Sequence, residues 1–200
     1  ERSEKTGHLD LGPISRGMSS YLSTKERWAQ ESGFNYVVEI SPQFQNDLDG
    51  DGGVQSNNET NLIGQWALLD KSDPGRGNLM FWYQWSTTMG GKSTSAYMQR
   101  LDVISPPNGG DTGDEVNRDL TQLFAWEQSF VDDRYRIMFG KLTTRVLFNL
   151  NRYAVGDRED FFTPMLVNNP VVDYTAKIGV GLFGEVKRDS WYVSGMVRDA

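Results

Sequence analysis

The densest group of side chains able to bind a polar solute lies between Leu142 and Gly156. This segment contains no acid, although the whole chain carries a net charge of −7. Its candidate binding residues are Arg145, Asn149, Asn151, Arg152 and Tyr153. A guanidinium stays charged and can donate two hydrogen bonds through its planar fork, and amide side chains both donate and accept. The segment therefore offers noncovalent recognition, and a mixed cluster at 157–160, which includes Arg158, follows it directly.

A second group, Asp47, Asp49 and Asp51, has the spacing of the first half of a calcium loop. Such loops place oxygen ligands at positions 1, 3 and 5 and a glycine at position 6, which is Gly52 here. The bidentate acid expected at position 12 is absent, because Asn58 occupies that place. No helical pattern flanks the loop, and Asp/Gly-rich sequence is also ordinary turn composition. Two interpretations therefore stay open, a calcium site and a plain polar loop.

The sequence contains no recognisable arrangement of catalytic residues. His8 is the single histidine, and no Ser/His/Asp set can be defended around it. The absence of cysteine excludes thiol catalysis, disulfides and Cys-ligated metals. The acids Glu39, Glu127 and Glu185 show no spacing that favours a glycosidase pair. We therefore expect no enzymatic activity, and no cofactor apart from the calcium alternative.

Composition and charge exclude two further classes. A chain of 200 residues suits one compact unit or part of a larger one. The negative net charge argues against a nucleic-acid partner held by bulk electrostatics. The longest stretch without a charge, residues 77–91, is shorter than the ~20 apolar residues that a membrane-spanning helix needs.

One helix is predicted, over Pro13–Ser32, where apolar residues recur close to a 3.6-residue period. Pro13 suits a first helical position, and Gly33 is placed just past the end. The amphipathic pattern fits a helix packed on a core, or alternatively a plug or collar against a larger assembly. We divide the chain into a leader with this helix (1–33) and a single sheet domain (34–200).

After Gly33 the hydrophobic period changes to two. Apolar residues and Pro42 occupy every even position from Phe34 to Phe44, and polar residues hold most odd ones. Similar runs follow at 59–69, 79–86, 119–130, 134–139, 175–182 and 191–198. The pattern predicts antiparallel strands, many of them longer than the ~5–6 residues usual in soluble proteins.

The expected connections alternate between short and long. Tight turns are predicted at 70–77, 131–134 and 187–190, and long polar loops at 46–58, 87–118 and 142–173. This asymmetry and the strand lengths are typical of an all-β fold, the antiparallel transmembrane β-barrel of the porin type, here with about seven or eight strands. In such strands the apolar face meets lipid and the polar face meets a water-filled lumen. Glu39, Glu127, Arg134, Arg136 and Lys141 are expected on or near the polar face. The alternative is a soluble β-sandwich, which also alternates.

From about Leu120 onward the sequence resembles a known family. The likeness is carried by Leu123-Phe-Ala-Trp-Glu-Gln-Ser-Phe130, Asp133-Arg-Tyr-Arg-Ile-Met-Phe-Gly-Lys-Leu142, Asn151-Arg-Tyr-Ala154, Phe161-Phe162, Val167-Asn-Asn-Pro170 and Trp191-Tyr-Val-Ser-Gly195. These segments resemble the carbohydrate-selective (OprB-type) porins of Gram-negative outer membranes. The part before Leu120 is similar in pattern more than in letters.

The resemblance implies a barrel of about sixteen strands in the outer membrane, through which small sugars diffuse passively. It implies contacts with outer-membrane lipid and lipopolysaccharide, and a constriction loop, for which the basic segment from Leu142 is the candidate. Because the chain ends in Asp199-Ala200 without a terminal aromatic residue, we expect it to be the N-terminal half of such a barrel. A half-barrel with two unpaired edges is expected to need its remaining strands. Two other functions stay open: a channel for small carboxylates or phosphates, and a soluble calcium-dependent sugar-binding sandwich.

Overall fold

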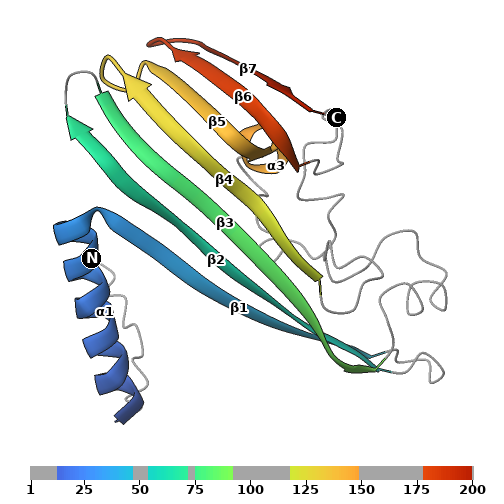
Figure 1. Ribbon diagram of the computed structural model, residues 1–200. Coiled ribbons are helices and arrows are strands. Elements are labelled where there is room, and N and C mark those ends of the chain that lie inside the picture. Colours follow the sequence, from blue (N-terminus) through green and yellow to red (C-terminus); the bar gives the residue numbers. More distant parts are fainter. Residues whose placement is uncertain (1–12, 47–53, 72–74, 92–117, 149–177, 200) are drawn as a thin grey trace, which may run out of the picture.

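The structure is a computed structural model that describes residues 13–46, 54–71, 75–91, 118–148 and 178–199. Its strands form one antiparallel sheet in which each pairs with its neighbours along the chain (Figure 1). They are β1 (Phe34–Asn46), β2 (Val54–Lys71), β3 (Gly75–Gly91), β4 (Arg118–Phe130), β5 (Tyr135–Thr143), β6 (Ile178–Lys187) and β7 (Tyr192–Arg198). The helices are α1 (Pro13–Ser32) and α3 (Thr144–Phe148). An antiparallel all-β fold with an N-terminal helix is confirmed. Among these seven strands the sheet is open, because β1 and β7 each pair with a single neighbour.

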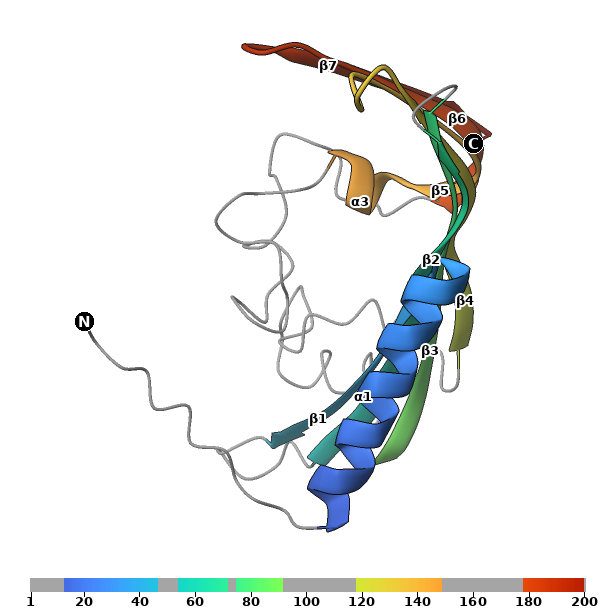
Figure 2. The same cartoon turned by 90° about the vertical axis from the view of Figure 1, so that its left-hand side faces the viewer.

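The two faces of this sheet differ in chemistry. Residues directly opposite in an antiparallel pair share a face, so the register Phe34↔Trp66, Trp66↔Leu79 and Leu79↔Trp126 follows one face across four strands. The sheet is curved, and α3 lies on its hollow side (Figure 2). We call that side the concave face; it carries Asn61, Arg136 and Phe183. The other side, the convex face, carries Val38, Phe81 and Phe139.

The predicted segregation of side chains between the two faces is confirmed for β1 and β3. Register places Phe34, Tyr36, Val38 and Ile40 on the same face as Leu79, Phe81, Tyr83 and Trp85. Glu39 and Gln84 lie on the opposite face, where both face Asn61 of β2. The period-two pattern of these strands therefore gives one apolar face, while the opposite face carries the polar residues together with some apolar ones.

Several strands are longer than the sequence pattern indicates, and β2 and β3 are the clearest cases. β2 begins at Val54, so the first connection spans 47–53 rather than 46–58, and β3 continues to Gly91. Apart from Val54, the added start of β2 is polar on both faces, yet it pairs in register with β1, from Pro42↔Asn58 to Asn46↔Val54. Backbone hydrogen bonding to two neighbours extends the strand where side-chain periodicity gives no signal. The short connections lie at one end of the sheet, and we call this the tight-turn end.

Helix α1 has the predicted bounds, and Gly33 terminates it with φ 71°. Glycine suits this left-handed position because a side chain would be strained there. The indole Nε1 of Trp66 donates to the carbonyl oxygen of Ser32 at 2.9 Å and ties the helix end to β2. The expectation of a helix packed on a core is wrong, because Met18, Tyr21, Leu22 and Trp28 stay exposed. Helix α1 contacts β1, where the hydroxyl of Tyr36 accepts from the hydroxyl of Tyr21 at 3.2 Å.

The apolar core of the described residues lies on the concave face, beneath α3. It consists of Leu123, Ala125, Met138, Leu142 and Phe183, with Leu147 and Phe148 packed against it. The ring of Phe148 meets that of Phe183 edge-on, with centroids 5.8 Å apart. The long loop predicted from Leu142 is therefore corrected at its start: Leu142 and Thr143 complete β5, and the next five residues form α3.

Candidate functional site

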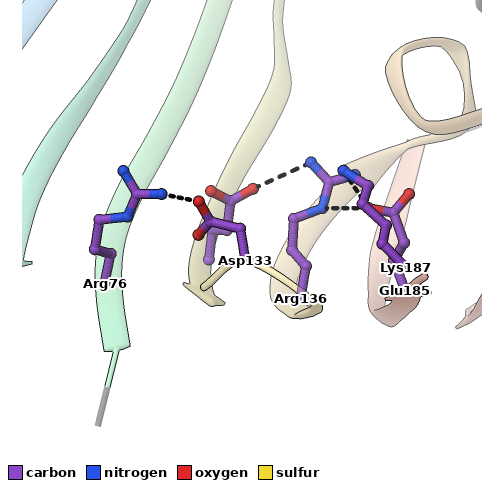
Figure 3. A network of polar contacts seen from close by, with 6 residues as sticks. Arg76, Asp133, Arg136, Glu185 and Lys187 are labelled. Atoms are coloured by element: carbon purple, nitrogen blue, oxygen red, sulfur yellow. Dashed lines mark hydrogen bonds and ion pairs between the residues drawn. The ribbon is translucent and has the colours of Figure 1, made fainter. Parts of the chain in front are cut away.

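A row of charged side chains crosses the concave face close to the tight-turn end. Arg136 of β5 lies between two carboxylates, with Nη1 3.5 Å from Oε2 of Glu127 on β4 and Nε 3.3 Å from Oε1 of Glu185 on β6. Lys187 extends the row, because its Nζ lies 3.0 Å from the same oxygen of Glu185 (Figure 3). We call Glu127, Arg136, Glu185 and Lys187 the charge ladder.

The charge ladder is positioned by strand pairing and by an aromatic ring. Arg136 lies opposite Glu185, and Met138 lies opposite Phe183, so the guanidinium and the phenyl ring share the concave face. The guanidinium carbon of Arg136 is 5.2 Å from the ring centroid of Phe183. A cation over a ring face is attracted by the ring quadrupole, which restricts the arginine further. Phe183 thus links the charge ladder to the apolar core.

A shallow depression of about 430 Å³ opens beside the charge ladder. Its lining comes from the five strands β2 to β6 and from the turn between β4 and β5: Gln65, Ala67, Arg76, Asn78, Glu127, Ser129, Asp133, Arg136 and Lys187. Arg76 pairs with Asp133 at its rim, and Nδ2 of Asn78 donates to Oε1 of Glu127 at 3.4 Å. Most of these residues offer a donor or acceptor on a rigid sheet, and noncovalent binding of a polar solute is the chemistry that this geometry supports.

A second polar cluster lies farther from the tight-turn end and centres on Asn61 of β2. Its Nδ2 donates to Glu39 at 3.2 Å and to Glu59 at 2.9 Å, while its Oδ1 accepts from Nε1 of Trp82 at 2.8 Å. Beside it, Gln122 donates to Gln84. Asn61 and Gln122 are fully buried, and a buried amide needs such partners to offset its lost hydration.

The structure brings together three of the predicted wall residues. Glu39, Glu127 and Arg136 lie on the concave face, as expected from alternation. Arg134 belongs instead to the turn between β4 and β5. The placement of Lys141 on the polar face is wrong, since Lys141 pairs with Phe124 and Val180 and shares the convex face with Phe139.

The remaining predicted site residues lie mostly beyond the described ranges. Arg145 falls within α3. The following lie outside the described residues: Asn149, Asn151, Arg152, Tyr153, Arg158, Asp47, Asp49 and Asp51. Among the residues that are described, no three histidine or acidic side chains are grouped to hold a metal ion. Of the two described helices, neither is long and apolar enough to cross a membrane.

Several residues of this face were not predicted from the sequence. Arg76, Asp133 and Lys187 join the charge ladder or its rim, and Trp82 and Gln84 join the Asn61 cluster. Alternation could have placed Glu185 and Lys187 on one face with Phe183. It could not pair them with Arg136, because that contact depends on the register between β5 and β6.

Comparisons of the chain with models of protein families, with curated proteins and with solved structures find no match.

Proposed function

We propose that this chain forms part of the wall of an outer-membrane β-barrel channel, through which small neutral carbohydrates diffuse passively. The observation that carries the proposal is the contrast between the two faces of a single antiparallel sheet, in which long strands pair in chain order. The convex face exposes apolar side chains from β1 to β7, including Ile40 at 67%, Leu182 at 55% and Val197 at 78% of their full area. The concave face bears the charge ladder and the Asn61 cluster.

A lipid environment explains the exposed convex face better than water does. Soluble monomers rarely expose large contiguous apolar patches, whereas membrane barrels present such a band to lipid and keep polar groups inside. A soluble sandwich would need a second sheet over this face, and none of the described strands lies there. The resemblance to OprB-type porins implies that further strands close the barrel.

The concave side supports a channel for neutral polar solutes. Selectivity in such pores comes from the donors, acceptors and charges that line them. In the charge ladder and its rim, the cations Arg76, Arg136 and Lys187 are matched by Asp133, Glu127 and Glu185. The charges therefore balance within this row, and Glu39 and Glu59 of the Asn61 cluster add further negative charge to the concave face. A wall of this kind gives no net attraction to anions, which favours sugars over the carboxylates or phosphates of the alternative function.

Liposome swelling with the intact protein tests this proposal. We expect glucose to enter faster than gluconate, an anion of similar size. Changing both Arg145 and Arg152 to alanine should slow glucose entry if the basic segment narrows the pore, and Arg27→Ala on the exposed side of α1 serves as the control. Faster gluconate entry would reassign the channel to anions. Absence of swelling, with protein that stays in solution without detergent, would contradict the membrane assignment.

A further inference from the structure

The depression beside the charge ladder combines a size and a chemistry that fit one small solute. Its volume of about 430 Å³ falls within the ~300–1,000 Å³ of typical ligand pockets. It lies at the tight-turn end of the sheet, and none of its lining residues belongs to the basic segment after Leu142. Its lining is built on β2 to β6 and their turns, so strand pairing fixes its shape.

The ion pairs of the charge ladder do not use all of the N–H donors of its cations. Arginine has five N–H donors, and the two ion pairs of Arg136 engage only Nε and Nη1 among the described contacts. Lys187 keeps two further N–H groups beyond its contact with Glu185, and its side chain is 53% exposed. Glu127 and Glu185 are 15% and 10% exposed, so the acids anchor the row and the cations reach outward.

Acceptors lie within the same depression. Each carboxylate oxygen has two lone-pair sites, and Glu127 uses one oxygen for Asn78 and the other for Arg136. Asp133 at the rim is half-exposed. A hydroxyl group both donates and accepts, so neighbouring hydroxyls of one solute match this alternation of cation and acid. The lining mixes the cations Arg76, Arg136 and Lys187 with the acids Glu127 and Asp133, so an ion of either sign would meet like charges as well as opposite ones.

We propose that this depression is a binding subsite on the translocation path for one neutral polyhydroxylated unit of a saccharide, held chiefly by Lys187, Arg136 and Glu127. The inference rests on the proposed channel function and adds a second contact point for the solute. The subsite lies at the tight-turn end of the concave face and shares no residue with the basic segment.

Current block in planar lipid bilayers tests the subsite with the intact protein and maltotriose as probe. Lys187→Gln should raise the half-blocking concentration about tenfold, the effect of one lost charge-assisted hydrogen bond. The exposed position of Lys187 makes this variant compatible with folding. Lys141→Gln is the matched control, because it removes the same charge from the convex face and should leave the block unchanged.

The outcomes separate the subsite from the channel. Equal half-blocking concentrations for Lys187→Gln, Lys141→Gln and the unchanged protein, in channels that conduct and pass sugar, would overturn the subsite alone. Stronger block by gluconate than by maltotriose would overturn the neutral polyhydroxylated class of ligand. A protein that forms no conducting channel would contradict the proposed function, and the subsite with it.

Discussion

Arg136 is the residue on which the charge ladder depends, because two acids on different strands share its guanidinium. Its side chain is 32% exposed, while Glu127 and Glu185 are more deeply placed. Replacing Arg136 leaves two carboxylates close together without the cation that neutralises them. The free energy lost when an ion pair is broken increases with the burial of the pair.

Arg136→Gln is therefore expected to lower the free energy of unfolding by about 1–3 kcal/mol, between the values for exposed and buried pairs. The matched control is Arg76→Gln, whose pair with Asp133 is half-exposed on both sides and should contribute ~1 kcal/mol or less. Urea unfolding of lipid-reconstituted protein measures both. Equal losses for the two variants would show that the charge ladder has no special role in stability.

For an individual residue, the sequence predicts which face of the sheet the side chain lies on better than it predicts which residues the side chain contacts. Alternation correctly places Glu39, Glu127 and Arg136, because each lies within a regular strand. It misplaces Lys141, which follows Phe139 by two residues and so must share its face. The charge of Lys141 suggested the polar side, but strand geometry and not side-chain chemistry decides the face.

Pairing of β4 with β5 depends on Gly140, which adopts φ 134°. A Cβ at this position would lie 2.4 Å from the carbonyl oxygen of Phe124 and 2.8 Å from Cα of Ala125. Both contacts are with backbone, which cannot move without breaking the ladder. Gly140 therefore permits a close approach that no other residue allows.

Gly140→Ala is expected to destabilise the protein by about 2–4 kcal/mol, combining backbone strain with overpacking. Gly184→Ala on β6 is the control, since a Cβ there meets nothing within 4 Å, and it should change stability by less than ~0.5 kcal/mol. Thermal unfolding of the two variants in parallel measures the difference. A Gly140→Ala protein as stable as the control would contradict the described β4–β5 geometry.

Elements with a strong periodic signal were predictable, and those held by long-range pairing were not. β1 and α1 follow from alternation and from the Pro13 and Gly33 boundaries. The polar start of β2 forms a strand because its backbone pairs with β1 and β3 on either side. Side-chain periodicity in the sequence does not indicate this backbone hydrogen bonding. Helix α3 is only five residues long, and its packing on Phe183 stabilises it more than its intrinsic propensity.

For the whole molecule, the central claim is that the convex face meets lipid and the concave face meets water. Sequence alternation predicts that the two faces differ, and the register confirms which residues share each face. The environment of each face depends on what surrounds the sheet, so it stays a prediction. Val37 and Val38 offer the sharpest comparison, because these adjacent valines are 51% and 47% exposed on opposite faces of β1.

The measurement that tests this claim most directly is the accessibility of nitroxide spin labels on the intact protein in lipid vesicles. The sequence has no cysteine, so Val37→Cys and Val38→Cys each provide a unique labelling site. We predict that the label at 38 collides with lipid-soluble oxygen and is protected from a water-soluble nickel chelate, and that the label at 37 shows the reverse. Two labels that both collide freely with the nickel chelate would contradict a lipid-facing convex surface.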